Sequence, residues 1–167
     1  DWRNYFYRAA AHNTISLNGA YLRGYGESQQ ENPVVKLLTP MVDEKNGTFL
    51  FRGEIQQGND DRHQYRHRRV IIGVPPNLIA VVDQIESNAV HAWEMSYHLG
   101  TGVTVDGEQG EFELSRSGRL LCKASIFNYV SEMVVVVEDD YVSPEYNLKL
   151  PSKTIRTTIW HQQSFRT

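Results

Sequence analysis

The 167-residue chain carries a formal charge of −3, from 17 basic and 20 acidic side chains. Hydrophobic residues make up 40% and charged residues 22% of the chain, which is typical of globular proteins and excludes the disordered and fibrous classes. The slight acidic excess argues against a nucleic-acid-binding protein, and no apolar run approaches the roughly 20 residues that cross a bilayer.

Short β-type runs, separated by clusters of Gly, Asn, Asp and Pro, follow one another along the whole chain. In chain order they predict strands over residues 13–17, 33–38, 48–55, 63–74, 78–82, 91–99, 111–115, 119–127, 133–138 and 154–162. Helical periodicity is almost absent. We therefore predict one all-β domain over residues 1–167, an antiparallel β-sandwich of two or more packed sheets with little or no helix.

Two local patterns make this prediction more specific. Residues 78–82 form an uninterrupted apolar run, which is typical of a strand buried on both faces. The pairs Asp106-Gly107 and Ser117-Gly118 are typical of two-residue hairpin turns.

The chain begins at Asp1 without a methionine or a leader pattern, which predicts a cut inside a longer polypeptide, with any localisation signal outside this part.

The first of three segments that point to a known family is residues 7–19, Tyr-Arg-Ala-Ala-Ala-His-Asn-Thr-Ile-Ser-Leu-Asn-Gly. It resembles the Arg-x-x-x-Ala-His-Asn-Thr signature of the heparinase II/III superfamily of polysaccharide lyases. Asn18 stands where the family more usually has Asp before the final glycine. This His-Asn-Thr element is the most specific part of the resemblance.

Two further segments follow in the family's order. Residues 65–70 and 78–85, the latter including Asp83, are similar to its His-x-Arg strand and the Val-Val-Asp strand after it. Residues 142–149 look like its Ser-Pro-x-Tyr-Gly-x-Lys stretch, with Asn147 in place of Gly. The three segments together cover nearly the whole chain, so the resemblance concerns all of it.

The resemblance implies the C-terminal β-sandwich of a lyase that cleaves uronate-containing polysaccharides, such as heparan sulfate or alginate, by β-elimination. In this family an α/α-toroid domain precedes the β-sandwich, and the substrate lies in the cleft between them. The family's catalytic Asn, Tyr and His have no match here, so we assign no catalytic residue and expect the isolated chain to be inactive. The implied partners are an acidic polysaccharide and the missing toroid, without nucleic acid or membrane, and the implied location is periplasmic or secreted.

The resemblance carries one site residue over to this chain. In several members the histidine of the His-Asn-Thr element ligates a structural zinc ion, together with a His and an Asp from the preceding segment; here it is His12. Strand alternation puts His12 on a polar face with Thr14 and Ser16. Because one imidazole cannot hold zinc alone, the resemblance implies zinc in the intact protein and no required cofactor in this chain.

The most basic stretch, residues 62–69, has two interpretations. Its arginines could contact an acidic polysaccharide, since guanidinium pairs with carboxylate or sulfate through two hydrogen bonds. Successive strand residues face opposite sides, however, so the run cannot form one patch. The residues favour a solvated strand with ion pairs to neighbours such as Asp60 and Asp61, in which His67 is a hydrogen-bonded sheet histidine.

Aromatic side chains at a period of two raise a similar choice. His91, Trp93 and Tyr97 share a face that could stack on sugar rings, but Met95 and Leu99 lie on the same face and favour the core.

Five other residues have plain interpretations. Cys122, the only cysteine, excludes internal disulfides and is expected to be a small buried hydrophobe. Asp139-Asp140 is expected to form an ordinary turn rather than a calcium site. Tyr5 and Tyr7 receive no proton-transfer role.

A second function class stays open beside the lyase domain, namely a non-catalytic carbohydrate-binding or assembly β-sandwich module. A mutarotase-like sandwich enzyme acting alone is less favoured, because no compact pair of acid and base stands out.

Overall fold

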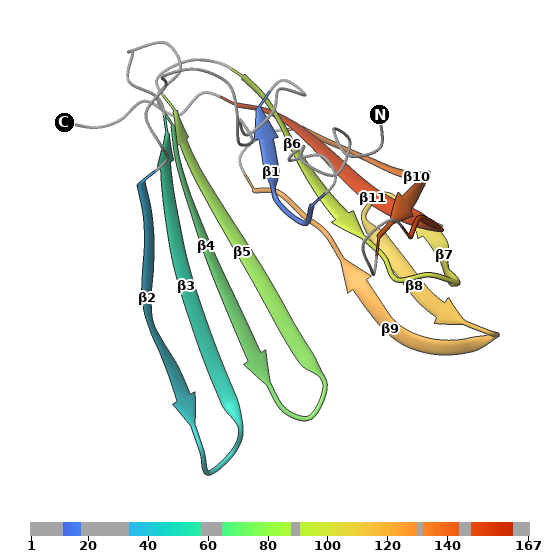
Figure 1. Ribbon diagram of the computed structural model, residues 1–167, viewed down its shortest axis with the longest axis horizontal. Helices are drawn as coiled ribbons and strands as arrows, with labels where there is room; N and C mark the ends of the chain where they lie inside the picture. The colour runs from blue at the N-terminus through green and yellow to red at the C-terminus, as the bar shows by residue number, and fades with distance from the viewer. Residues whose placement is uncertain are drawn as a thin grey trace. The chain divides into compact units, whose positions relative to one another are not determined.

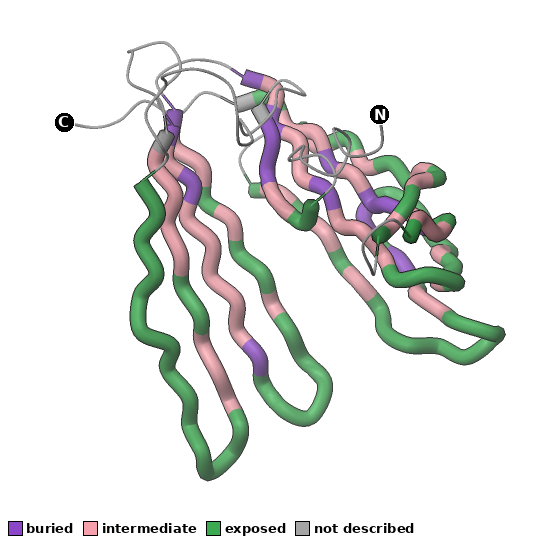
Figure 2. Tube along the Cα trace, viewed as in Figure 1, coloured by how far each residue is buried: buried purple, intermediate pink, exposed green. Residues whose placement is uncertain are grey.

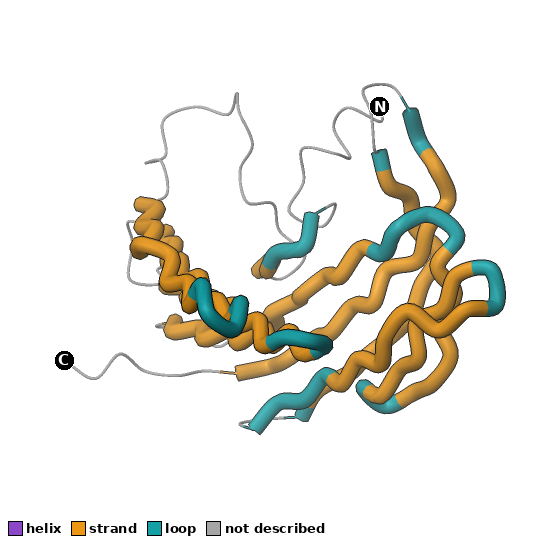
Figure 3. The backbone as a smooth tube through the Cα atoms, turned by 90° about the horizontal axis from the view of Figure 1, so that it is seen from below, coloured by secondary structure: helices purple, strands orange, loops and turns teal. Residues whose placement is uncertain are grey.

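The computed structural model describes residues 12–17, 34–57, 65–87, 91–129, 132–143 and 148–161. These residues form strands and the turns and loops that connect them, with no helix among them (Figure 3). The described part accordingly contains no helix long and apolar enough to cross a membrane. The strands lie in three sheets, and every pairing is antiparallel. The predicted all-β, antiparallel class is confirmed.

The chain divides into two compact units. Unit 1 comprises Asp1–Glu27 and His91–His161, and unit 2 comprises Ser28–Val90 and Gln162–Thr167. The expectation of a single domain over residues 1–167 stays a prediction.

Unit 2 contains one four-stranded meander, which we call sheet B. Its strands are β2 (Val34–Asp43), β3 (Thr48–Gln57), β4 (Tyr65–Val74) and β5 (Leu78–Ser87), paired in that order. The turns of the β2–β3 and β4–β5 hairpins lie at the same end of the sheet (Figure 1). The β2–β3 register shifts between Leu38 and Met41, beside Pro40, because proline has no N–H to donate and is tolerated on edge strands at such irregularities.

Unit 1 contains a four-stranded sheet, which we call sheet A. It has the order β1 (Ile15–Leu17), β6 (His91–His98), β11 (Leu150–His161) and β10 (Met133–Val142). The centre of this sheet is the best-buried part of the unit, with Ile15, Trp93 and Ile155 in its core (Figure 2). Strand alternation and the register place Trp93 and Ile155 on one face and Thr154 on the other, so the sheet is covered on both sides there.

The second sheet of unit 1, sheet C, has three strands in the order β7 (Val103–Glu108), β8 (Glu111–Arg116) and β9 (Arg119–Ser125). The predicted hairpin at Ser117-Gly118 is confirmed, since both residues have positive φ angles, 51° and 74°. The predicted turn at Asp106-Gly107 is wrong. Both residues lie in β7, and the turn falls at Gln109-Gly110.

Gly107 is needed in β7 for its backbone conformation rather than for a turn. Its φ is 120°, and a Cβ at this position would lie 2.2 Å from the carbonyl oxygen of Glu111. A glycine is therefore the residue that fits there.

Three further predictions are wrong. Residues 78–82 form the start of β5 as expected, but this run is not buried on both faces, because Leu78, Ile79 and Val82 are all exposed. Cys122 is exposed rather than buried. Asp139 and Asp140 lie within β10 and not in a turn, since β10 continues to Val142.

Candidate functional site

Two polar clusters lie on opposite faces of β4, within the basic stretch that the sequence singles out. Because side chains alternate along a strand, Tyr65, His67 and Arg69 share one face of sheet B, and Arg66 and Arg68 share the other. We call these faces the His67 face and the ladder face.

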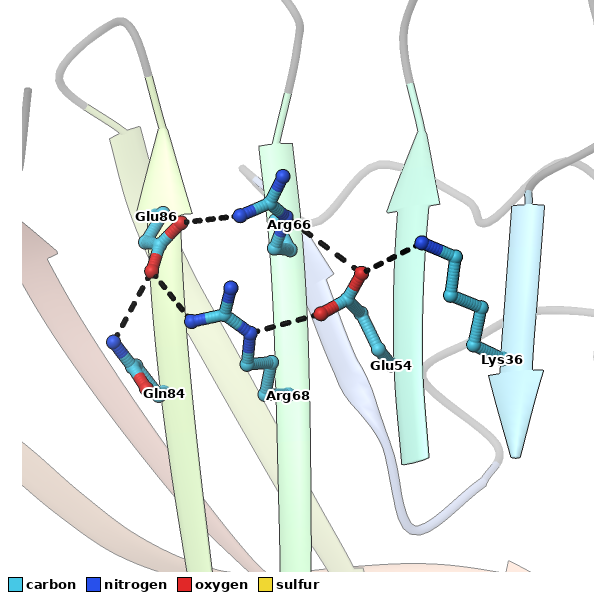
Figure 4. Close-up of polar contacts among 6 residues, drawn as sticks. All are labelled: Lys36, Glu54, Arg66, Arg68, Gln84 and Glu86. Carbon is cyan, nitrogen blue, oxygen red and sulfur yellow. Dashed lines mark hydrogen bonds and ion pairs between the residues drawn. The ribbon is translucent and has the colours of Figure 1, made fainter. Parts of the chain in front are cut away.

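The ladder face carries a row of ion pairs and hydrogen bonds that crosses all four strands of the sheet (Figure 4). Its members, which we call the ladder, are Lys36, Glu54, Arg66, Arg68, Gln84 and Glu86. Arg68 donates to both carboxylates, from Nε to Glu54 at 2.8 Å and from Nη1 to Glu86 at 2.9 Å. Arg66 Nη1 lies 3.2 Å from Glu86, and Lys36 Nζ lies 3.8 Å from Glu54.

The ladder leaves little free charge. Three cations face two carboxylates, and the hydrogen bond from Arg68, against some desolvation, holds the pKa of Glu54 below its ordinary value. The prediction that the basic run is a strand whose arginines form ion pairs is confirmed. Its partners are Glu54 and Glu86 on neighbouring strands, while Asp60 and Asp61 lie outside the described residues.

On the His67 face, His67, Asp83 and Arg69 form a buried cluster that joins β4 to β5. The side chains of His67 and Asp83 are 8% and 6% exposed, and His67 Nε2 lies 2.6 Å from Asp83 Oδ1. Arg69 donates to both oxygens of the same carboxylate, at 2.7 and 3.1 Å. The expectation that His67 is a hydrogen-bonded sheet histidine is confirmed.

The electrostatics of this cluster favour an ionised carboxylate. Burial acts to raise the pKa of Asp83, but the hydrogen bonds from His67 and Arg69 outweigh it and hold the pKa below its ordinary value. An ionised carboxylate only accepts hydrogen bonds, so His67 Nε2 carries the shared proton. Tyr65, next on the same face, is buried, and burial raises the pKa of its phenol to about 12. Tyr65 is therefore protonated at neutral pH and is poorly suited to act as a base.

In unit 1, the His-Asn-Thr segment is tied to strand β6. Asn13 Oδ1 accepts a hydrogen bond from the backbone N–H of His98 at 2.6 Å, and the Thr14 carbonyl accepts one from Ser96 N–H at 3.3 Å. His12 itself is exposed. Among the described residues, no three His, Cys, Asp or Glu side chains gather into a group that could hold a metal ion.

A second buried polar cluster lies on sheet A. Thr154, which is fully buried, joins His98 of β6 to Asp140 of β10: its Oγ1 is 2.9 Å from His98 Nδ1 and donates to Asp140 Oδ2 at 2.8 Å. The sequence does not reveal this cluster, and Asp140 was expected to lie in a turn. Strand alternation puts His98 on the face of β6 opposite to that of Trp93, but its partners lie more than 40 positions further along the chain, and no local pattern links them to it.

The aromatic face of β6 is part of the core, as predicted, rather than a sugar-stacking surface. Trp93 is 3% exposed, and the His91 ring meets it edge-on at a centroid distance of 5.7 Å. Met95, Tyr97 and Leu99 are half-buried.

Parts of the two terminal segments of the resemblance, residues 7–11, 18–19 and 144–147, lie outside the described residues, and so does Tyr5. Near the second of these, Lys149 Nζ lies 3.1 Å from the centroid of the Tyr141 ring.

Comparison with known proteins gives one family and one fold. The family model described as "Heparinase II/III-like, C-terminal" matches residues 1–164. The chain is also similar to two crystal structures of the heparan sulfate lyase HepC from Pedobacter heparinus, one of them a mutant. In both cases the TM-score is 0.71 at 14% identity, covering 98% of this chain and 24% of the lyase.

At that identity the likeness shows the fold alone. The chain spans about a quarter of the length of the lyase that it matches. No curated protein matches the sequence.

Proposed function

The chain belongs to the heparinase II/III-like, C-terminal family, and from this membership we propose that it is the C-terminal β-domain of a polysaccharide lyase. The substrate would be a uronate-containing polysaccharide of the heparan sulfate or alginate kind, cleaved by β-elimination, with this chain forming one wall of the cleft. The family match over residues 1–164 is the observation that carries the proposal. The substrate class is proposed from the family resemblance, and the likeness to a heparan sulfate lyase agrees with it in fold.

The chemistry explains why this chain would not act alone. β-Elimination removes the C5 proton of a uronate and expels the 4-linked oxygen, so it needs a base, an acid and a group that stabilises the charged carboxylate. Among the described residues, Tyr65 is protonated and the imidazole of His67 is held by Asp83. We assign the acid and the base to the part of the polypeptide outside this chain.

The proposal predicts a sharp difference in activity between the full-length protein and this chain. Incubated with a panel of uronate polymers, the full-length protein is expected to generate the ultraviolet absorbance of an unsaturated uronate, and the 167-residue chain to generate none. Turnover by the isolated chain, or a full-length protein inert on every polymer of the panel, would contradict it.

A structural zinc ion held partly by His12 belongs to the same proposal. The described residues do not complete such a site, since His12 is exposed and no group of three ligand-type side chains accompanies it there. One imidazole is too few for zinc, so the remaining ligands would come from outside the described residues.

Metal analysis tests the role of His12. The purified full-length protein is expected to contain about one zinc ion per molecule, and His12→Ala to lose most of it. Lys45→Ala, in an exposed turn, should keep the ion. Zinc absent from the unmodified protein, or equal in both variants, would refute the assignment.

The same proposal includes an acidic polysaccharide and a preceding α/α-toroid as partners, and a periplasmic or secreted location; these rest on family membership. The alternative, a non-catalytic carbohydrate-binding module, loses its main support, because the arginines on the ladder face are engaged by Glu54 and Glu86.

A further inference from the structure

The turn between β2 and β3 presents an Asn-Gly pair to solvent. Residues 44–47 form this turn at the tip of the hairpin (Figure 1), and Asn46 and Gly47 are both exposed. In an Asn-Gly pair the backbone nitrogen of the glycine can attack the side-chain carbonyl carbon of the asparagine, because glycine has no Cβ to hinder the approach. The sequence contains a second such pair, Asn18-Gly19, outside the described residues. The structure therefore allows the reaction to be judged at Asn46.

The hydrogen bonding of the Asn46 side chain favours this attack. The backbone N–H of Thr48 donates to Asn46 Oδ1 at 2.8 Å, which folds the carboxamide back over the Gly47 peptide. The same donor lies where negative charge develops on Oδ1 as the carbonyl carbon is attacked, and backbone N–H groups stabilise oxyanions in this way. Electrophile, nucleophile and donor come from three consecutive residues, so they are already close together in the folded turn.

One contact opposes the attack. The backbone N–H of Gly47 donates to the carbonyl oxygen of Asp43 at 2.8 Å, so this hydrogen bond has to open before the nitrogen can react. It lies in an exposed turn at the end of a hairpin, where local opening costs little free energy and is fast compared with a reaction that takes hours or longer. The hydrogen bond therefore does not protect Asn46.

We propose that Asn46 is a site of spontaneous deamidation. The Gly47 nitrogen loses its proton to water and bonds to Cγ of Asn46, while the side-chain nitrogen takes up a proton and leaves as ammonia, which closes a succinimide ring. Water then opens the ring at either carbonyl carbon and leaves aspartate or isoaspartate at position 46. One water is consumed and one ammonia is released, with no oxidant, reductant or enzyme.

The product alters the charge and the backbone of the turn. Asp43, Glu44 and Lys45 already give this end of the hairpin an acidic excess, and a carboxylate at position 46 adds a further negative charge. Isoaspartate also inserts a methylene group into the main chain, which moves the acceptor away from the N–H of Thr48. The end of the β2–β3 hairpin is therefore expected to loosen, and hydrogen exchange in its peptides to increase.

Peptide mass spectrometry of the full-length protein, stored in neutral buffer at physiological temperature, tests the proposal. The amide of Asn46 is expected to convert to a carboxyl group at least about ten-fold faster than that of Asn77. Asn77 is the matched control, because it is exposed in the β4–β5 turn of the same sheet but is followed by Leu78. A smaller difference would overturn the proposal. Asn46→Gln, whose longer side chain disfavours the ring, should abolish the conversion, and its persistence in this variant would count against Asn46 as the site.

Comparison with the urea-unfolded protein tests the part played by the turn. In the folded protein Asn46 is expected to convert no more than about three-fold more slowly than in the unfolded chain, because the exposed turn opens readily. Stronger slowing would mean that the folded protein shields the pair, and the proposal would be wrong. Neither measurement uses lyase activity, so the proposed function and this inference can fail separately.

Discussion

Replacing Asp83 with asparagine is expected to destabilise unit 2 by about 3–5 kcal/mol, one of the two largest effects of any single substitution that the structure suggests. The Asp83 carboxylate is 6% exposed and is the shared partner of His67 and Arg69. An amide cannot neutralise the guanidinium or accept as many hydrogen bonds, so Asp83→Asn leaves a half-buried cation without its counter-ion. Hydrogen exchange in the β4 and β5 peptides of the full-length protein would measure the loss.

Asp139→Asn is the matched control, because it makes the same chemical change at the surface. Asp139 also forms an ion pair, with Lys153 Nζ at 2.7 Å, but its side chain is 88% exposed. Exposed pairs contribute about 0–1 kcal/mol, so this variant should change stability little. Equal effects of the two substitutions would mean that the buried cluster does not stabilise the sheet.

The same cluster predicts how unit 2 responds to acid. The pKa of Asp83 is lower in the folded state than its unfolded value of about 3.9. Its ionisation therefore stabilises the fold above that value, and the contribution is lost as the pH falls through the folded pKa. Asp83→Asn should flatten this part of the pH profile, and an unchanged acid slope in the variant would contradict the assignment.

Replacing Trp93 with alanine is expected to cost about 3–5 kcal/mol in unit 1, through lost burial and the cavity that remains. Trp93 is 3% exposed at the centre of sheet A, where β6 lies between β1 and β11, and the edge-on contact with His91 would be lost as well. Hydrogen exchange in the β6 and β11 peptides would follow the change.

Trp160→Ala tests whether the cost comes from burial. Trp160 lies on the neighbouring strand β11 and is 52% exposed, so the same substitution should cost about 1 kcal/mol or less. A comparable loss from both substitutions would show that Trp93 does not occupy the core position described.

Most strands of this fold are readable from the sequence, because their signals are local. Alternating β-branched and aromatic residues between turn clusters located β3, β4 and β6 to within a few residues. The predicted strands over residues 63–74 and 78–82 leave only residues 75–77 for the turn between them, and this turn sets the β4–β5 register. Counting equal steps back from that turn brings Arg69 opposite Asp83, so the buried cluster was within reach of sequence reasoning.

The errors concern features that depend on distant parts of the chain. Glycine after aspartate is typical of a hairpin turn. Gly107 instead lies inside β7, where its backbone has a φ of 120°. The alternation of apolar residues correctly predicts that Cys122 lies in a strand. It does not predict whether that strand is buried, and β9 is largely exposed. Residues 78–82 are a similar case, because their apolar run predicts burial on both faces, whereas Leu78, Ile79 and Val82 are exposed.

The sequence predicts which residues of the candidate site are basic, but not which acidic residues form ion pairs with them. The basic run of β4 was found, but Glu54 and Glu86 reach it from other strands through sheet pairing that residue spacing does not reveal. The cluster of His98, Thr154 and Asp140 was missed for the same reason, because it joins β6 to β10 and β11, whose residues lie more than 40 positions further along the chain. The role of His12 in binding zinc stays a prediction.

The mass of the products tests the central claim most directly. A full-length protein that acts by β-elimination should release from its uronate polymer oligosaccharides that carry an unsaturated terminal ring and lack one water relative to hydrolysis products. Products heavier by that water, without the ultraviolet absorbance of the double bond, would identify a hydrolase and contradict the assignment of this chain to a lyase.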